Sequence, residues 1–287
     1  MRVAIVARRD SETNRRLAAC TIPGAEVALL TPADALQQLR PGDVALGRLD
    51  VADALDGVES GLSELLRLEE LGVRVLNRPS TLLASHDKLL TARVLNGAGL
   101  PHPRTAFVQP AGRMPRMRLP LVVKPRFGSW GRDVALCTSH RALEQQLCAL
   151  AFRPWFLTRG ALAQELVPPQ GYDLRLVVAG GRVVGAARRT AAPGEWRTNV
   201  ALGGVTEPTE PPALARALAL SAAAAIGADL VGVDLLPTEN GYLIIELNGA
   251  VDFRPEYSLG AGDVFESAVA QLLRVARERR ELSAVGA

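Results

Sequence analysis

A glycine-rich loop follows an apolar run in "LVVKPRFGSWGRDVAL", residues 121–136. Lys124 ends the apolar run, and Gly128 and Gly131 lie in the loop beyond it. Glycines let backbone N–H groups approach an anion closely, and a lysine adds a positive point charge. One interpretation is a β-hairpin whose tip closes over phosphate, with Trp130 covering the site. An ordinary hairpin with glycine at its turn explains the stretch equally well.

Acidic and amide side chains lie at the ends of two later apolar runs. Asp234 closes "LVGVD", and Glu246 and Asn248 stand two residues apart in "LIIELN", so the latter two share one face of a strand. If the two runs pair as antiparallel strands across a turn at Asn240 and Gly241, the three side chains can converge. They supply the hard oxygen ligands that Mg²⁺ prefers. The alternative is that each is a strand-end polar group facing water.

Composition limits the classes of function. The chain has 287 residues, of which 48% are hydrophobic and 4% are aromatic, and its formal net charge is +3. This length allows two or three lobes, because domains usually contain about 100 to 200 residues. Few aromatic side chains and a small net charge give little support for a nucleic-acid surface built on stacking. The composition is compatible with a soluble globular protein that binds small anionic ligands.

The cysteines and the first residues bear on the compartment. Cys20, Cys137 and Cys148 are odd in number and lack close metal-ligand spacing, which favours reduced thiols over a disulfide framework. The apolar run within "MRVAIVARRD" is too short for a signal peptide or a membrane span. We therefore expect a cytoplasmic protein with no membrane segment.

Strands and helices that could position these side chains alternate along residues 1–85. The strand candidates are "RVAIVA", "AEVALL", "DVALGRL" and "VRVLN", and the helix candidates are "SETNRRLAAC" and "SGLSELLRLEEL". This alternation predicts a small α/β lobe.

Two further parts are expected after residue 85. Residues 86–160 hold a helix stopped by Gly97 and Gly99, the strand "TAFV", a basic loop "GRMPRMRLP", the glycine loop with its flanking strands, and an amphipathic helix "SHRALEQQLCAL". Residues 161–287 are strand-rich, with a hairpin turn at "AGGR" and an alanine-rich helix within "PPALARALALSAAAAIGA". The predicted fold class is α/β, with α+β character in the two later parts.

Seven segments, in chain order, resemble ATP-grasp ligases of the RimK/LysX-like branch. They are "NRPSTLLASHDKLLTARVLNGAGLPHPRT", "LPLVVKPRFGSWGRDV", "AQELV", "GYDLRLVVAGGRVVGAARRT", "WRTNVALGG", "VGVDLL" and "LIIELN", within residues 77–248. The resemblance implies an ATP-grasp fold with a small N-terminal α/β lobe, a central lid subdomain and a C-terminal antiparallel-sheet subdomain. It also implies a homodimer or homotetramer.

The resemblance assigns roles to individual residues. It implies ATP contacts at Lys88, Lys124, Gly128, Ser129, Trp130, Gly131, Arg132, Glu165, Leu166, Val167 and Asp173. Residues 128–132 would form a mobile lid, and residues 165–167 would lie along the adenine. It implies Mg²⁺ (or Mn²⁺) ligands at Asp234, Glu246 and Asn248. Arg175, Arg189, Arg197 and Asn199 would face the reacting phosphate and substrate carboxylates, although a surface arginine such as Arg197 is more often simply solvated.

The chemistry implied by the resemblance is ATP-dependent amide formation. The enzyme would transfer the γ-phosphoryl group of ATP to a carboxylate, which yields an acyl phosphate and ADP. An amino acid amine would then attack the acyl phosphate and displace phosphate. Positioning and charge stabilisation suffice for this reaction, so His86, His102 and His140 receive no catalytic role. The carboxylate could belong to a small acidic carrier protein, where it would be a C-terminal glutamate, or to a peptide. The alternatives are a free-standing dipeptide or glutathione-synthetase-like ligase and a non-catalytic ATP-binding regulatory protein.

Two departures from the family pattern concern the substrate side. Leu202 in "NVALGG" stands where relatives commonly carry an arginine, and "NGAVDFRPEYSLG" matches neither the RimK nor the LysX branch after the metal asparagine. Asp252 could pair with a substrate amine and Arg254 with a carboxylate. A local salt bridge is an equally good explanation for both residues.

Overall fold

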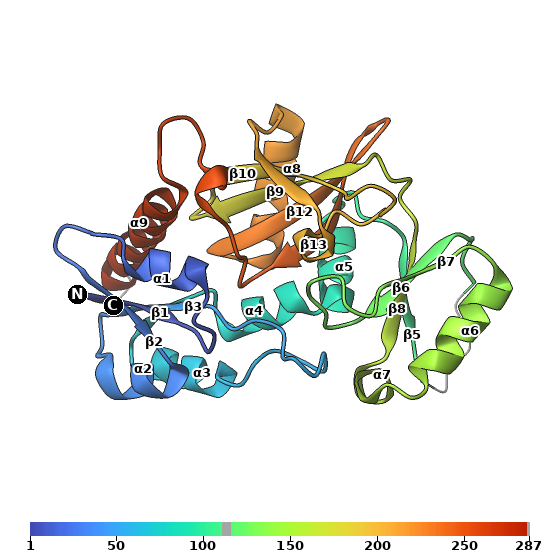
Figure 1. Cartoon of the computed structure of the whole chain (residues 1–287). Helices are drawn as coiled ribbons and strands as arrows, with labels where there is room; N and C mark the ends of the chain where they lie inside the picture. Colours follow the sequence, from blue (N-terminus) through green and yellow to red (C-terminus); the bar gives the residue numbers. More distant parts are fainter. Residues whose placement is uncertain (111–115, 286–287) are drawn as a thin grey trace.

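The computed structural model describes residues 1–110 and 116–285. Within them the strands form three sheets, which Figure 1 shows at lower left, at right and at upper centre; we call them the N-terminal, central and C-terminal sheets. Residues 112–115 of the predicted basic loop lie outside the described residues. No helix in the described part of the chain is both long and apolar enough to cross a membrane.

The N-terminal sheet is parallel, with strand order β2-β1-β3-β4. Its strands are β1 (Arg2–Val6), β2 (Glu26–Leu30), β3 (Val44–Gly47) and β4 (Arg74–Leu76), as predicted. Its helices are α1 (Glu12–Ala18), α2 (Pro32–Gln38) and α3 (Leu62–Glu70). Ser11 caps α1 by accepting a hydrogen bond from the Asn14 N–H. The short α2, which the sequence patterns did not single out, is capped in the same way by Thr31.

The central sheet is antiparallel, with order β5-β8-β6-β7. Its strands are β5 (Thr105–Val108), β6 (Leu121–Pro125), β7 (Ala135–Cys137) and β8 (Ala161–Glu165), and the nearby helices are α4 (Pro79–His86), α5 (Lys88–Gly97), α6 (His140–Leu150) and α7 (Pro154–Arg159). Strands β6 and β7 form the predicted hairpin around the glycine loop. Strand β8 follows residue 160, but it pairs with β5 and β6 of the central sheet. The domain boundaries predicted after residues 85 and 160 stay a proposal.

The C-terminal sheet has five antiparallel strands in the order β11-β10-β9-β12-β13. Its elements are β9 (Tyr172–Ala179), β10 (Arg182–Thr190), η1 (Val200–Leu202), β11 (Val205–Pro208), α8 (Ala213–Ile226), β12 (Leu230–Thr238), β13 (Gly241–Asn248), η2 (Pro255–Tyr257) and α9 (Val264–Val285). The predicted antiparallel pairing across Asn240 and Gly241 is confirmed as β12 and β13.

Helices α8 and α9 cover opposite faces of the C-terminal sheet. Alternate residues of β9 show this, because Leu176 and Val178 share a core with α8, whereas Val177 and Ala179 share one with α9. The α9 core also includes Val3 and Ile5 of the N-terminal sheet, and Figure 1 shows α9 beside α1 and β1. Helix α9, which the sequence patterns did not single out, therefore joins these two sheets.

Candidate functional site

One cavity of about 360 Å³ lies where the three sheets meet. Every residue that the sequence assigned to ATP, to the metal or to the reacting groups lines this cavity. The structure therefore brings together side chains that are up to 160 positions apart, from Lys88 to Asn248. Ser11, Thr13 and Asp50 also line it, and the sequence patterns did not identify these as site residues.

Lys88 connects the glycine loop to strand β13. Its Nζ donates to the Gly128 carbonyl at 2.5 Å and forms an ion pair with Glu246 Oε1 at 2.8 Å. Lys88 begins α5, where Asp87 is the N-cap and accepts from the Leu89 N–H at 3.0 Å. The cap and the first helical turn thus hold the lysine between the loop and the carboxylate.

Lys124 is a buried cation at the end of β6. Its Nζ donates to Gln164 Oε1 at 2.9 Å, and the residue is 7% exposed. Burial lowers the pKa of Lys124 to about 8, the charge of Lys88 acts in the same direction, and Glu246 opposes both. Lys88 and Lys124 are the only lysines in the chain. Apart from the three histidines, all other basic side chains are arginines.

The tip of the glycine loop contacts the segment 195–202. Arg197 Nη1 donates to the Gly131 carbonyl at 3.3 Å, and a Cβ at Gly131 would lie 3.2 Å from Asn199 Oδ1. Gly131 has a φ of +70°, a conformation that glycine adopts without steric cost. Trp130 is half exposed beside it. The loop is thus in contact with the far side of the cavity, as a closed lid would be.

A buried network of arginines and aspartates forms the floor of the cavity. Arg175 donates to both oxygens of Asp234 at 2.7 Å, and Arg189 donates to Asp234 at 2.9 Å and to Asp173 at 2.8 and 2.5 Å. Thr198 Oγ1 donates to Asp173 at 2.5 Å. Burial by itself would raise the pKa of Asp234, but the two guanidinium groups outweigh it and hold that pKa well below its usual range.

The position of Asp234 differs from the prediction in one respect. The apolar pattern placed it at a strand end, but β12 continues to Thr238, and Asp234 lies in the middle of the strand opposite Glu246. The register shifts immediately after Asp234, so the strand is irregular at the position of the carboxylate. Asp173 and Asp234 both serve as partners of arginines here, a role that their sequence positions did not reveal.

The proposed metal ligands fit a hard divalent cation unequally. Glu246 has one carboxylate oxygen in its ion pair with Lys88, which leaves the other for a metal. Asn248 Nδ2 is buried with no hydrogen-bond partner among the described residues, and the amide oxygen Oδ1 is the atom that this side chain would offer to a metal. Asp234 Oδ2 already accepts two hydrogen bonds and Oδ1 accepts one, so one acceptor position remains. These oxygens suit Mg²⁺, which completes its coordination shell with water and substrate phosphates.

The described residues contain no cluster of three or more His, Cys, Asp or Glu side chains that could hold a metal. A cation at Glu246 would therefore depend on the remaining acceptor position of Asp234, on the amide oxygen of Asn248 and on oxygens from a substrate. His86 is buried and His102 is half-buried. Burial lowers the pKa of His102 to about 4, and its Nδ1 lies 2.7 Å from the Ile244 carbonyl oxygen, so it serves as a neutral structural group.

The predicted adenine edge is partly occupied by the protein's own hydrogen bonds. The Glu165 N–H donates to the Arg104 carbonyl at 3.0 Å, and the Leu166 N–H donates to the Pro120 carbonyl at 3.2 Å. Both N–H groups thus fix the end of β8 against neighbouring segments. A base at this edge would use the backbone carbonyls of residues 165–167 or the N–H of Val167.

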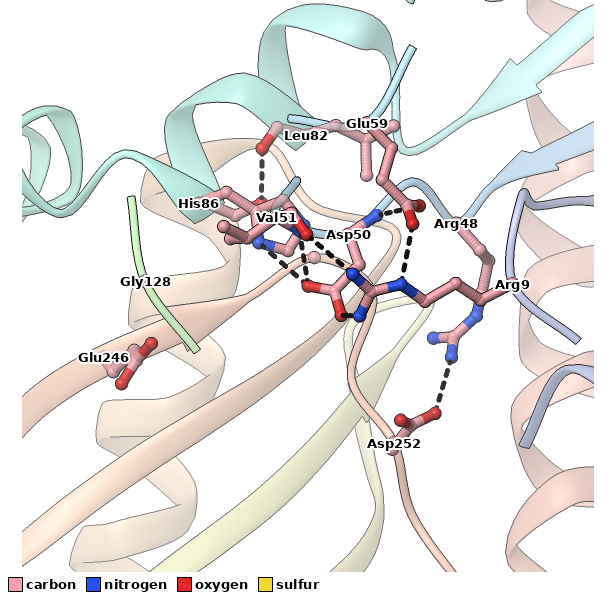
Figure 2. A network of polar contacts seen from close by, with 12 residues as sticks. Arg9, Arg48, Asp50, Val51, Glu59, Leu82, His86, Gly128, Glu246 and Asp252 are labelled. Atoms are coloured by element: carbon pink, nitrogen blue, oxygen red, sulfur yellow. Dashed lines mark hydrogen bonds and ion pairs between the residues drawn. The ribbon is translucent and has the colours of Figure 1, made fainter. Parts of the chain in front are cut away.

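The N-terminal sheet contributes a polar wall to the cavity. Figure 2 shows Asp50 between His86 and Arg9, and Arg48 beside Asp252. Ser11 follows β1 and Asp50 follows β3, so both lie at the carboxyl edge of a parallel sheet, where ligands commonly bind. That rule was the one sequence signal that could have identified them. Asp252 accepts from Ser11 Oγ at 3.0 Å and lies 3.6 Å from Arg48 Nη2, so its partners within the protein are distant in the sequence.

Comparison with known proteins agrees with this arrangement. A family model described as the RimK-like ATP-grasp domain matches residues 85–258. A probable alpha-L-glutamate ligase of Parasynechococcus marenigrum (strain WH8102) is 35% identical over 190 residues, which cover 64% of this chain and 40% of that protein. A probable alpha-L-glutamate ligase 2 of Shewanella sp. (strain MR-4) is 28% identical over 272 residues, which cover 87% and 88%. The chain thus spans 40% of the length of the first of these relatives, and it spans 64% of a probable alpha-L-glutamate ligase of Aeromonas salmonicida (strain A449).

A solved structure of D-alanine–D-alanine ligase from Bacillus anthracis in complex with ATP superposes with a TM-score of 0.70 at 16% identity, covering 99% of each chain. At this identity the likeness concerns the fold alone. It confirms the predicted ATP-grasp fold, in which residues 85–258 carry the family domain.

Proposed function

The chain belongs to the RimK-like ATP-grasp family, and from that premise we propose that it is an ATP-dependent carbon–nitrogen ligase. It joins a carboxylate to the amine of an amino acid through an acyl phosphate and releases ADP and phosphate. A carboxylate oxygen is a poor leaving group, and phosphorylation converts it into a good one. The amine then attacks the acyl carbon, and phosphate departs.

One observation carries this proposal: the only two lysines of the chain face the same cavity as Glu246 and Asn248. A lysine ammonium is a compact point charge that suits phosphate, whereas arginines supply the paired, rigid contacts elsewhere in the cavity. A cavity with two lysine ammonium groups beside hard oxygen ligands supports binding of a triphosphate with its Mg²⁺.

In this proposal the chain's own residues divide the work. Lys88, Lys124 and the loop 128–132 hold the phosphates, and the loop excludes water that would hydrolyse an acyl phosphate. Glu246, Asn248 and Asp234 hold Mg²⁺, which when bound neutralises charge on the transferring phosphoryl group. Arg197, which contacts the loop carbonyl at Gly131, orients the closed lid.

The substrate is proposed from the relatives' names. Both relatives described above are called probable alpha-L-glutamate ligases, so L-glutamate is the first amino acid to test. The second substrate is proposed to be a peptide or a carrier-protein C-terminus. Leu202 directly follows the cavity-lining residues 196–201, and its side chain cannot form the ionic contact that an arginine at this position would. The free thiols of Cys20, Cys137 and Cys148 support a reducing compartment such as the cytoplasm.

The test is a screen of carboxylates with hydroxylamine as a surrogate amine, with ATP and Mg²⁺ present. The panel contains the twenty L-amino acids and short peptides that end in glutamate. We expect ADP and a hydroxamate to form together with at least one of them. Nucleotide binding without ADP formation on the whole panel would favour the non-catalytic alternative, and activity only with a free amino acid would favour a small-molecule ligase.

A pair of variants tests the metal site in the same assay. Glu246→Gln keeps the size of the side chain but removes its charge, and we expect ADP formation to fall by at least a hundredfold because phosphoryl transfer loses a metal ligand. Glu239→Gln, an exposed residue in the turn between β12 and β13, is the control and should retain full activity. Turnover of Glu246→Gln at the control rate would refute the metal assignment.

A further inference from the structure

The segment 251–254 presents two charged side chains to the cavity. All four of its residues line the cavity, but Val251 and Phe253 are buried at 1% and 2% exposure, whereas Asp252 is partly exposed and Arg254 is exposed. In an extended segment alternate side chains point to opposite sides, and Arg254 has extended backbone angles, with φ −129° and ψ 169°. The buried pair therefore fixes the direction in which Asp252 and Arg254 point.

Helix α1 holds this segment in place. The Phe253 N–H donates to Thr13 Oγ1 at 3.1 Å, and the Thr13 hydroxyl donates to the Phe253 carbonyl at 3.0 Å. The Phe253 ring stacks on Phe265 with 4.9 Å between centroids. The backbone between Asp252 and Arg254 is thus anchored on both sides, which is the preorganisation that a binding subsite needs.

A buried arginine lies beside the carboxylate of Asp252 within the protein. Arg48 is 2% exposed, its Nε donates to Asn14 Oδ1 at 2.7 Å, and its Nη2 lies 3.6 Å from Asp252 Oδ1 (Figure 2). Arg48 Nη1 is buried without a hydrogen-bond partner among the described residues. Asp252 Oδ1 is thereby held by Arg48 and by Ser11, while the side chain remains 38% exposed and can offer Oδ2 to a ligand.

We propose that Asp252 and Arg254 form the subsite for the amino acid that supplies the amine. Asp252 accepts hydrogen bonds from its amino group, Arg254 binds its α-carboxylate, and Arg48 positions Asp252. The side chains stand two residues apart, roughly 7 Å along an extended chain, a spacing that can grip the adjacent ammonium and carboxylate of one amino acid. This inference rests on the proposed ligase function.

The geometry also indicates which substrate binds there. The carboxylate to be phosphorylated must be free to accept the phosphoryl group near Lys88 and Glu246, whereas a carboxylate bound by Arg254 is already paired with a cation. Asp252 follows Asn248 by four residues, which span at most about 14 Å of chain. An amino acid gripped by its carboxylate at Arg254 can therefore direct its amine toward the metal ligands.

The test compares amino acids with their α-carboxamides as amine suppliers, at saturating ATP, Mg²⁺ and the carboxylate selected with hydroxylamine. We expect the wild-type protein to show a KM at least tenfold lower for the acid, because a charged pair with Arg254 is lost in the amide. Arg254→Gln should abolish this preference. Glu256→Gln, an exposed neighbour that does not line the cavity, should keep it.

The Asp252→Asn variant tests the amine contact separately. It should raise the KM for acid and amide alike by tenfold or more, whereas Glu256→Gln should leave both KM values and hydroxamate formation with hydroxylamine within twofold of wild type. If Asp252→Asn does not fold because Arg48 loses its partner, Arg254→Gln still decides the proposal.

The measurements distinguish an error in the proposed subsite from an error in the proposed ligase function. A wild-type protein that forms hydroxamate and uses amino acids as amines, but prefers no acid over its amide, refutes the subsite alone. One that forms hydroxamate but uses no amino acid refutes the subsite and the amino acid as amine supplier, while ATP-dependent activation of a carboxylate stands. A wild-type protein that forms neither hydroxamate nor ADP refutes both proposals.

Discussion

Lys124 is the residue whose protonation is most sensitive to its surroundings. Its ammonium is buried and neighbours Lys88, and both features disfavour the charged form. A bound polyphosphate would favour the charged form, so binding should draw a proton onto Lys124. Because the pKa of Lys124 in the free protein is about 8, nucleotide affinity should be highest below pH 8 and should fall as pH rises through that value.

Because the chain has only two lysines, the pKa of Lys124 can be measured directly. Lysine labelled with ¹³C at Cε should give two side-chain signals, and we expect the signal of Lys124 to titrate near pH 8. Saturating ATP analogue and Mg²⁺ should raise that midpoint by at least one unit. Lys88→Arg assigns the signals, because it removes only the other one. A Lys124 midpoint near 10.5 in the free protein would contradict the effect of burial.

The glycine loop is the element on which closure of the cavity depends. Its tip packs against the segment 195–202 through Gly131, Arg197 and Asn199. This contact needs both a positive φ and the absence of a side chain at Gly131. A lid built in this way closes only if the tip backbone can approach the opposite segment.

Substitution of Gly131 by alanine should therefore impair catalysis more than stability. The new Cβ would lie 3.2 Å from Asn199 Oδ1 and 3.4 Å from Leu202, so the tip must move, and we expect kcat/KM for ATP to fall at least fivefold. Gly24→Ala is the matched control, since Gly24 has a φ of +76° and open space around it. Both variants should lose about 1 kcal/mol of unfolding free energy from the positive φ. Equal kcat/KM for the two variants would show that closure does not need this contact.

The N-terminal and C-terminal sheets are joined by buried polar contacts as well as by α9. Asn77, at φ +50° after β4, is completely buried. Its Nδ2 donates to the carbonyls of Leu230 and Gly249 at 2.6 and 3.1 Å, and its Oδ1 accepts from the N–H groups of Asp229 and Leu230 at 2.9 Å each. One amide side chain thus connects the N-terminal sheet to β12 and to the end of β13.

Removal of that amide should destabilise the whole molecule. Asn77→Ala leaves two buried donors and two buried acceptors without their partner, so we expect a loss of about 3 kcal/mol or more in the free energy of unfolding. Urea denaturation followed by circular dichroism measures it. Asn240→Ala, in the exposed turn between β12 and β13, should change the value by less than about 0.5 kcal/mol. A similar loss in both variants would show that Asn77 does not join the sheets.

The sequence determined the type and order of most elements and part of the lining of the cavity. Apolar periodicity predicted the strands of the N-terminal sheet, and the Asn-Gly turn predicted the pairing of β12 with β13, which is confirmed. These signals are local, because strand period and turn chemistry depend on residues within about ten positions of one another. The resemblance then assigned Lys88, Lys124 and Glu246 to one site, and all three line the cavity.

Only the tertiary structure decided how these residues are paired. Arg175 and Asp234 are 59 positions apart, and Ser11 and Asp252 are 241 apart. The placement of β8 in the central sheet and the contact of Arg48 with Asp252 are equally long-range. No local pattern contains such pairings, because they arise when separate strands and helices bury their apolar faces together, and packing then determines which charged groups meet in the low-dielectric interior.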